Sequence, residues 1–227
     1  MREDYYSQLS EFAHFSGIME IPIIHKPERI VIPKRIVPFS QRNRCNPDES
    51  FVCFYEDDKL FIDFLNHPEA YLDDLKRFLG VITPDPSLNN DMPLVVQLHN
   101  VYIARSIGAW LQREGIYVVP NVRWGDERTY TTQFLPEMVP YLGIEQNGIV
   151  AIGTFGCNQG NEEKTHLREG IRSLIRQCQP LYVLIYGARP KSVFEEFEEQ
   201  TTFIDYPDWH KLCHRGNKDK RVLSALV

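Results

Sequence analysis

The chain has 227 residues, a formal net charge of −6 and a hydrophobic fraction of 43%. This length favours one large domain, and the apolar content is too high for a disordered chain. The acidic balance disfavours a dedicated nucleic-acid binder, because phosphate contacts require a basic surface. Nucleic-acid association stays open only through two basic segments, residues 26–44 and 211–221.

The cysteines and the apolar runs indicate the compartment. The five cysteines are widely and irregularly spaced, which is typical of free thiols rather than of a disulfide framework. The chain opens on the polar sequence Met1-Arg2-Glu3-Asp4, not on a secretory signal, and no apolar run reaches the length of a membrane span. We therefore expect a cytoplasmic protein with no membrane contact.

The N-terminal third has an irregular pattern. A helix is expected over residues 4–15, extended segments over 21–24 and 30–37, a strand over 51–55 and a helix over 68–78. Prolines interrupt the two extended segments and remove backbone donors, so these segments are expected at a sheet edge or wrapped over the core.

A regular alternation begins at Gly80. Strands are expected over 80–83, 116–122, 148–154, 181–186 and 201–204, and helices over 92–114, 130–141, 162–178 and 191–199. The strands are continuous apolar runs, which is typical of parallel strands buried on both faces. The fold class is therefore α/β, with a mostly parallel sheet of four to five strands, flanking helices and an irregular β-containing N-terminal extension; the sheet is either open or a partial barrel.

Three segments are expected within one cooperative unit. Residues 1–79 form the N-terminal helix and proline-interrupted strands that pack on the core, residues 80–206 form the α/β core, and residues 207–227 form a basic tail. This division follows the change in composition at Gly80 and the cluster of lysines and arginines near the C-terminus.

Ligands of parallel α/β folds bind beyond the carboxyl ends of the strands. The residues that follow each predicted strand are therefore candidate site residues. Two carboxylates in these positions are candidates for acid–base work, Asp85 and Asp126. Candidate ligand-binding residues are Arg105, Asn121, Arg123, Trp124, Thr154, Gly156 and Tyr186. Arg105 is included because a guanidinium on a mostly buried helix needs a carboxylate or phosphate partner.

Each of these assignments has a structural alternative. Asp85 and Asp126 are equally typical of helix or turn caps. The glycine-rich segment 153–160 follows a strand and precedes a helix, which fits an anion cradle, but it lacks the spacing of a known phosphate loop. Cys157 has no identifiable base, and the cluster of His210, Cys213 and His214 matches no common zinc spacing, so neither a nucleophile nor a metal site is predicted.

Several of these residues together resemble a known but uncharacterised protein family. The resemblance rests on Met92-Pro93-Leu94, on Asn121-Val122-Arg123-Trp124, and on Thr154, Gly170 and Tyr186-Gly187. The chain is similar here to a "domain of unknown function" family of bacteria, phages and mobile elements, over about residues 80–187. The resemblance implies such an origin and the same strand-end site, but no activity or cofactor.

We therefore expect a protein that binds, and by one hypothesis hydrolyses, a small anionic ligand of phosphorylated or nucleotide-like chemistry. In this hypothesis Arg123 holds the anion, Trp124 stacks on the ligand or forms a wall, and Asp85 or Asp126 acts as base or metal ligand. Two alternatives stay open: a non-enzymatic accessory that binds a protein partner in defence or replication, and a nucleic-acid-associated protein. The sequence does not decide between an enzyme and a binding protein.

Overall fold

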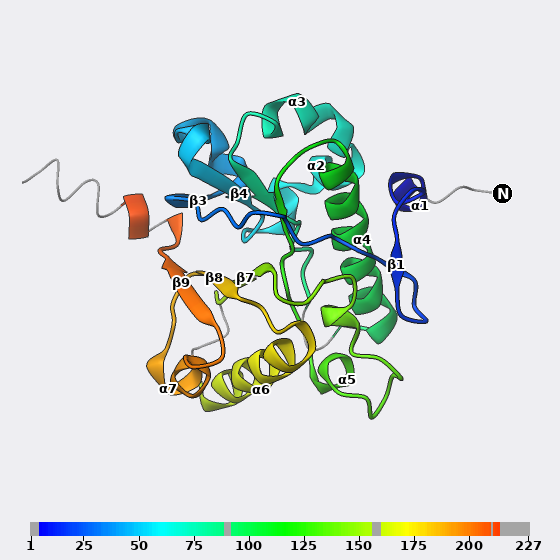
Figure 1. The fold of residues 1–227 in the computed structure, drawn as a ribbon, viewed down its shortest axis with the longest axis vertical. Helices are drawn as coiled ribbons and strands as arrows, with labels where there is room; N and C mark the ends of the chain where they lie inside the picture. The colour runs from blue at the N-terminus through cyan, green and yellow to red at the C-terminus, as the bar shows by residue number, and fades with distance from the viewer. Residues whose placement is uncertain (1–4, 89–91, 156–159, 210, 214–227) are drawn as a thin grey trace, which may run out of the picture.

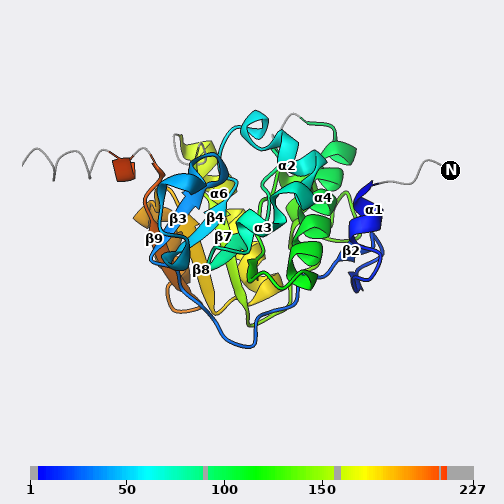
Figure 2. The ribbon, with the colours of Figure 1, turned by 90° about the horizontal axis from the view of Figure 1, so that it is seen from above.

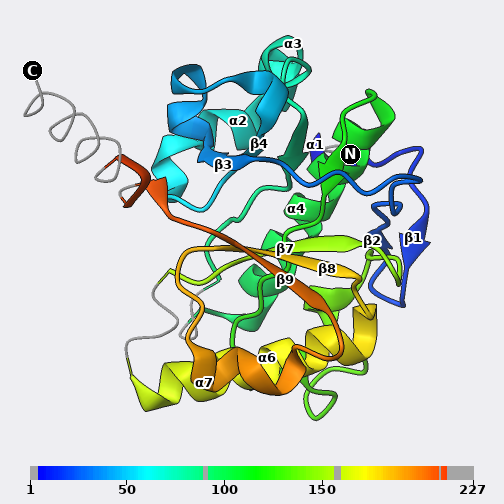
Figure 3. The same ribbon diagram turned by 60° about the vertical axis from the view of Figure 1, so that its left-hand side comes forward.

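The computed structural model describes residues 5–88, 92–155, 160–209 and 211–213. Within these ranges seven parallel strands follow one another in chain order (Figures 1 and 3). They are β3 (Arg35–Pro38), β4 (Ser50–Cys53), β5 (Gly80–Ile82), β6 (Val118–Val119), β7 (Ile149–Gly153), β8 (Tyr182–Tyr186) and β9 (Thr202–Tyr206). The sheets β3–β6 and β7–β9 meet where Asn121 pairs with Ala151 in a parallel bridge.

The strands have one inner and one outer face; both faces are buried in β4, β5 and β6, whereas β9 is partly exposed. In β8, Leu184 and Tyr186 face an interior cluster, whereas Val183 and Ile185 pack in the cluster that contains the apolar side of helix α6 (Asn161–Cys178). The interior cluster takes side chains from all seven strands: Ile36, Phe51, Cys53, Ile82, Val119, Ile149, Ala151, Leu184, Tyr186 and Tyr206. Strands in chain order around one shared interior are the arrangement of a (β/α) barrel.

The wall of this barrel is incomplete. Among the described residues no strand pairing joins β9 to β3, and the two ends are instead linked by the Tyr206 hydroxyl, which donates to the Pro33 carbonyl oxygen at 2.8 Å. The structure therefore resolves the two expected arrangements in favour of the partial barrel, and it confirms the α/β class.

Helices cover the outer face (Figures 1 and 2). Helix α4 (Leu94–Arg113) packs against the first sheet, and α6 packs against the second. The shorter α-helices are α1 (Tyr5–Leu9), α2 (Ile62–Asn66), α3 (Leu72–Leu75), α5 (Glu127–Tyr130) and α7 (Lys191–Phe194). The 3₁₀ helices are η1 (Phe39–Arg44), η2 (Pro47–Glu49), η3 (Asp58–Leu60), η4 (Pro68–Tyr71), η5 (Val139–Tyr141) and η6 (Glu195–Phe197). In the part of the chain that the structure describes, no helix combines the length and apolarity needed to cross a bilayer.

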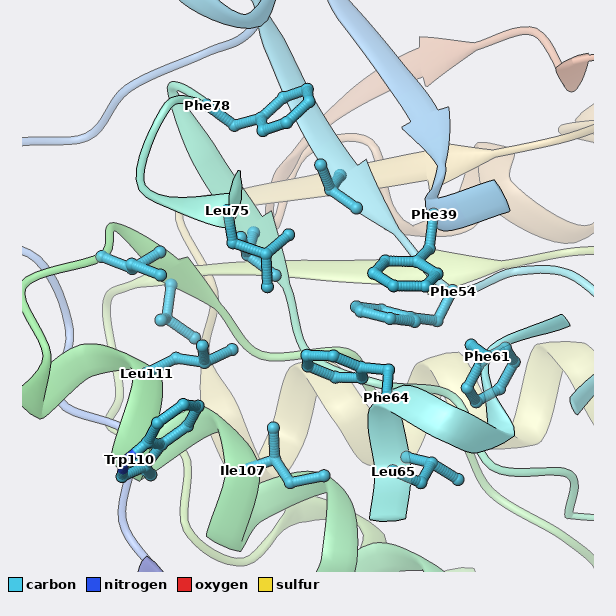
Figure 4. Packing of buried hydrophobic residues seen from close by; sticks show 14 of the residues in the cluster. Phe39, Phe54, Phe61, Phe64, Leu65, Leu75, Phe78, Ile107, Trp110 and Leu111 are labelled. Atoms are coloured by element: carbon cyan, nitrogen blue, oxygen red, sulfur yellow. The ribbon is translucent and has the colours of Figure 1, made fainter. Parts of the chain in front are cut away.

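An aromatic cluster fills the space between the first sheet and its helices (Figure 4). The ring of Phe54 stacks on Phe39 at 5.2 Å and on Phe64 at 4.8 Å between centroids, and Phe61 contacts it edge-on at 5.4 Å. These rings come from η1, from the residue after β4 and from the α2 region, so one cluster holds together three neighbouring segments of the N-terminal third.

The five strands predicted from Gly80 onward are all present, and the N-terminal third adds two more. β3 pairs in parallel with β4, and β4 pairs in parallel with β5, so the parallel core begins at Arg35 and not at Gly80. β3 lies at the edge of its sheet, as its prolines predicted, whereas β4 is central. The remaining strands, β1 (Phe15–Ser16) and β2 (Ile21–Pro22), form a separate antiparallel pair.

Some predicted helices are shorter in the structure, and one is wrong. Residues 130–141 do not form a helix; α5 ends at Tyr130, and the segment stays irregular up to η5. Pro136 and Pro140 explain the difference, because each removes a backbone donor that a helix interior needs. The helix expected over 4–15 is reduced to α1 in the described residues.

Candidate functional site

A pocket of about 580 Å³ opens where the seven parallel strands end. Each strand contributes to its lining through its last residue or through the loop that follows: Ser40 after β3, Tyr55 after β4, Asp85 after β5, Arg123 after β6, Gly153 in β7, Tyr186 in β8 and Asp208 after β9. This is the mouth at which barrel enzymes hold their substrates. We call it the mouth pocket.

A hydrogen-bonded network of four side chains lies at the mouth pocket. Asp85 is 7% exposed and accepts from Asn121 Nδ2 at 2.8 Å and from Arg123 Nη1 at 3.0 Å. The Tyr55 hydroxyl donates to Asn121 Oδ1 at 2.9 Å. The backbone N–H of Asn121 donates to Thr83 Oγ1 at 2.8 Å, which fixes the loop that carries the amide.

Burial decides the protonation behaviour of Asp85. Loss of solvation raises the pKa of its carboxyl group, and the neighbouring Arg123 and the hydrogen bond from Asn121 only partly offset this effect. Burial likewise raises the pKa of Tyr55, so this phenol stays protonated and donates. A carboxyl group with a raised pKa beside a pocket is suited to exchanging a proton with a bound ligand.

Aromatic rings form the walls beside this network. Tyr55 and Tyr186 stack with centroids 5.5 Å apart and planes inclined by 24°. Gly153 permits this position of Tyr55, because a Cβ atom there would lie 2.5 Å from the ring. The backbone N–H of Trp209 donates to the Tyr186 hydroxyl at 2.9 Å. Phe155 also lines the pocket and is 80% exposed.

The rim of the mouth pocket is acidic. Glu56 accepts from the backbone N–H and the hydroxyl of Ser40, and Asp57 forms an ion pair with Lys59 at 2.9 Å. Asp208 forms an ion pair with Lys211 at 3.2 Å. Together with Asp85, these three carboxylates outnumber Arg123, which is the one cation among the described residues of the lining.

Arg105 does not reach the mouth pocket, and its partners differ from those expected. The guanidinium is 2% exposed and donates to three backbone carbonyl oxygens, those of Leu142 at 3.1 Å, Asn121 at 2.8 Å and Pro140 at 2.8 Å. The expected carboxylate or phosphate is replaced by the carbonyl groups of two irregular segments, whose oxygens carry the complementary partial charge. Desolvation lowers the pKa of Arg105 to about 10.

Asp126 is a helix cap at a separate position. It is the N-cap of α5, its carboxylate accepts from the backbone N–H of Arg128 at 3.0 Å, and it forms an ion pair with the Arg128 side chain at 2.6 Å. Gln97 Nε2 also donates to it, at 3.2 Å. Hydrogen bonding from Arg128 is the main cause that lowers the pKa of Asp126 to about 2.

Replacing Asp126 by asparagine is expected to lower the free energy of unfolding at pH 7 by about 1–2 kcal/mol. The pKa of Asp126 is lower in the folded chain than in the unfolded chain, so its contribution is complete above about pH 4 and disappears as the pH falls toward 2. Urea unfolding of both proteins between pH 2 and 7 measures this; a difference that stays constant over this range would contradict the assignment.

The other predicted residues are distributed between the pocket and the core. Tyr186 lines the mouth pocket, whereas Trp124 packs on helix α6, where a Cβ atom on Gly170 would lie 1.9 Å from its indole ring. Thr154 is fully buried, and its hydroxyl donates to the Ala188 carbonyl oxygen at 2.7 Å. Gly156, like Cys157 and half of the glycine-rich segment 153–160, lies outside the described residues.

Several pocket residues were not predicted from the sequence, among them Ser40, Tyr55 and Glu56. These three follow strands β3 and β4, which were not assigned to the parallel core. The strand-end rule would have found them once the run Phe51-Val52-Cys53-Phe54 was read as a buried parallel strand. The acidic turn that follows this run was the available signal.

The described residues contain no group of three or more histidine, cysteine or acidic side chains that could hold a metal ion. His210 and His214 of the cluster considered above lie outside the described residues. Cys45, Cys53, Cys178 and Cys213 are free thiols, and burial raises the pKa of Cys53 and Cys178. These two thiols are therefore poor nucleophiles.

Comparison with known proteins gives one family and two phage relatives. A family model described as "Domain of unknown function (DUF4417)" matches residues 13–207. The chain is 37% identical to the "Gene 1 protein" of Mycobacterium phage L5 and 32% identical to the "Gene 1 protein" of Mycobacterium phage D29, each over 134 residues. These residues are 59% of this chain and 56% and 47% of the relatives, so the match spans about half the length of each relative. No solved structure matches the chain.

Proposed function

The chain belongs to the DUF4417 family, as its sequence resemblance predicted, and we propose that it binds a small nucleotide-like ligand in the mouth pocket. The observation that carries the proposal is the convergence of Asp85, Asn121, Arg123 and Tyr55 at a pocket formed by the ends of all seven parallel strands. A pocket with aromatic walls and a few connected polar groups is the usual form of a small-molecule site.

The lining favours the nucleoside part of such a ligand over a polyphosphate. Tyr186, Phe155 and Trp209 offer apolar ring surface to a planar base. Asp85 and Arg123 lie side by side, so they present an acceptor and a donor to the polar edge of the base. The carboxylates of the rim repel negative charge, so a phosphate group is placed toward solvent or near Arg123.

Asp85 is the group suited to acid–base work if the ligand is turned over. Burial raises its pKa above the usual range of a carboxyl group, although the contact with Arg123 opposes this shift, and the raised pKa favours proton exchange with a bound ligand. Asn121 and Tyr55 act as positioning residues, because they hold one carboxylate oxygen in place through a chain of hydrogen bonds.

The basic segment 26–44 gives no support to the nucleic-acid alternative. Lys34 forms an ion pair with Glu49 at 2.6 Å, and Arg42 forms one with Asp74 at 2.6 Å. The Arg42 guanidinium also lies over the Phe39 ring, 4.0 Å from its centroid. The Arg42 side chain is engaged within the protein, whereas the Lys34 side chain is 72% exposed, so the pairing argues against phosphate binding at Arg42.

The test combines thermal melting with a ligand panel. Nucleosides and nucleoside monophosphates of the five common bases are added singly, and at least one is expected to raise the melting temperature of the full chain. Asp85→Asn should abolish this shift, Arg123→Ala should weaken it, and Asp63→Asn, which changes an exposed carboxylate, should leave it unchanged. A shift that survives both pocket variants, or a panel without any shift, would contradict the proposal.

The same Asp85→Asn variant is expected to unfold at the same temperature as the unmodified protein, or higher, at pH 7. Burial raises the pKa of Asp85 in the folded chain, so its ionised form reduces the stability once the pH exceeds the unfolded value. Asparagine removes the buried charge and keeps a side-chain oxygen that can accept from Arg123. A preserved melting temperature therefore separates loss of binding from loss of folding, whereas a marked fall in melting temperature would show that Asp85 serves mainly to stabilise the fold.

A further inference from the structure

A second cluster of chemical groups lies on the surface that bears α1, β1 and β2. His14 precedes β1, His25 follows β2, and Glu145 lies in the segment between η5 and β7. Nδ1 of His14 is 3.1 Å from Nε2 of His25, and the other ring nitrogen of His25, Nδ1, is 3.0 Å from Glu145 Oε1. Both histidines are exposed, and both line a hollow of about 360 Å³ that also contains Phe12 and Arg113.

His25 is held from two sides. The side chain of Gln112 in α4 accepts from the backbone N–H of His25 at 2.9 Å and donates to its carbonyl oxygen at 2.7 Å. Glu145 is fixed in turn, because its second oxygen accepts from the backbone N–H of Lys26 at 2.7 Å. The imidazole of His25 is therefore oriented before any ligand arrives, which is a property of binding sites rather than of ordinary exposed histidines.

His14 is positioned by the backbone. Its carbonyl oxygen accepts from the backbone N–H of Ile23 at 2.7 Å, next to the antiparallel pairing of β1 with β2. The two imidazoles therefore come from neighbouring extended segments, and their ring centroids are 5.2 Å apart with planes inclined by 79°.

We propose that His14 and His25 form a two-histidine site for a divalent transition-metal ion such as Zn²⁺, with Glu145 as the outer partner of His25. Zinc–nitrogen bonds of about 2.0–2.1 Å place two ligand nitrogens about 2.9 Å apart at a right angle and about 3.4 Å apart at the tetrahedral angle. The observed separation of 3.1 Å lies between these limits. A carboxylate that accepts from the second nitrogen of a ligating histidine is the common outer arrangement of zinc sites.

Metal binding needs one proton to move within the His14 ring and releases none. In the neutral tautomer of His25 that carries its proton on Nδ1, toward Glu145, the Nε2 atom offers a lone pair. With this tautomer, the proton between the two rings belongs to His14 Nδ1, and it moves to Nε2 of the same ring when Nδ1 binds the metal. Water completes the coordination, since the described residues offer no third histidine, cysteine or carboxylate for this site. The metal ion would link the residue before β1 to the segment after β2, which the hydrogen bond between His14 and His25 joins in the structure.

The inference does not depend on the mouth pocket and is tested by calorimetric titration of the full chain with ZnCl₂. One equivalent is expected to bind, and Zn²⁺ should also raise the melting temperature. His14→Ala and His25→Ala should each weaken binding at least tenfold, and Glu145→Gln should weaken it about 10–100-fold, the usual effect of losing an outer partner. Mg²⁺ should not compete, because it prefers oxygen ligands.

The control is the variant in which His210, Cys213 and His214 are all replaced by alanine, because these residues are the other close set of zinc-binding side chains in the sequence. Zinc binding that persists in this variant and is lost in the His14 variant supports the proposal. No binding, binding that survives both His14→Ala and His25→Ala, or binding lost in the control variant alone would overturn it. Circular dichroism verifies that each variant is folded.

Discussion

Replacing Arg105 by methionine is expected to lower the free energy of unfolding by about 3 kcal/mol, since three buried carbonyl groups lose their donor at once. Arg105 is 2% exposed, and it donates to Leu142, Asn121 and Pro140. Each unsatisfied carbonyl group costs about 1–3 kcal/mol. Methionine also removes the desolvation cost of the buried Arg105 charge, which offsets part of the total loss from the three groups. Because Asn121 also contacts Asp85, the variant should weaken ligand binding in the mouth pocket as well.

Urea unfolding followed by circular dichroism measures this change. Arg113→Met is the matched control, because Arg113 lies on the same helix, its side chain is 44% exposed, and its described partners are the adjacent Glu114 and the exposed ring of Phe12. Its replacement should change the stability by less than about 0.5 kcal/mol. Arg105→Lys should fall between the two, since lysine cannot donate in three fixed directions. A loss below about 1 kcal/mol for Arg105→Met would refute the structural role.

Replacing Phe54 by alanine is expected to lower the free energy of unfolding by about 3–5 kcal/mol. Its ring is fully buried, and it stacks on both Phe39 and Phe64 (Figure 4). The change leaves a cavity between the first sheet and the α2 region, and rigid neighbouring rings limit its collapse. Loss of ring stacking adds to the loss of apolar burial.

The measurement is again equilibrium unfolding in urea, with Phe134→Ala as the control, because Phe134 is 58% exposed. The control should stay within about 0.5 kcal/mol of the unmodified protein. Since Phe54 directly precedes Tyr55, the variant should also reduce ligand-dependent stabilisation through the mouth pocket. Equal effects of the two phenylalanine changes would contradict the packing described here.

The sequence alone determined the class of fold and the edge at which to search for a site. Continuous apolar runs such as Leu181-Tyr182-Val183-Leu184-Ile185 predicted parallel strands with two buried faces, and all five strands predicted in this way are present. The reason is physical: a strand buried on both faces cannot alternate in polarity, so its pattern is visible locally. The same strand ends yielded Asp85, Asn121 and Arg123, which the structure brings together.

Only the tertiary structure decided which polar residues share the pocket. From the sequence there was as much reason to place Asp126 and Arg105 in the site as Asp85 and Arg123. In the structure, however, Asp126 caps α5 and Arg105 donates to three carbonyl groups inside the protein. Their roles depend on which backbone groups lie next to them in space, and that information is not local. The same holds for β3 and β4, whose place in the barrel follows from their pairing with each other and from the pairing of β4 with β5, and for His14 and His25, which meet across two segments.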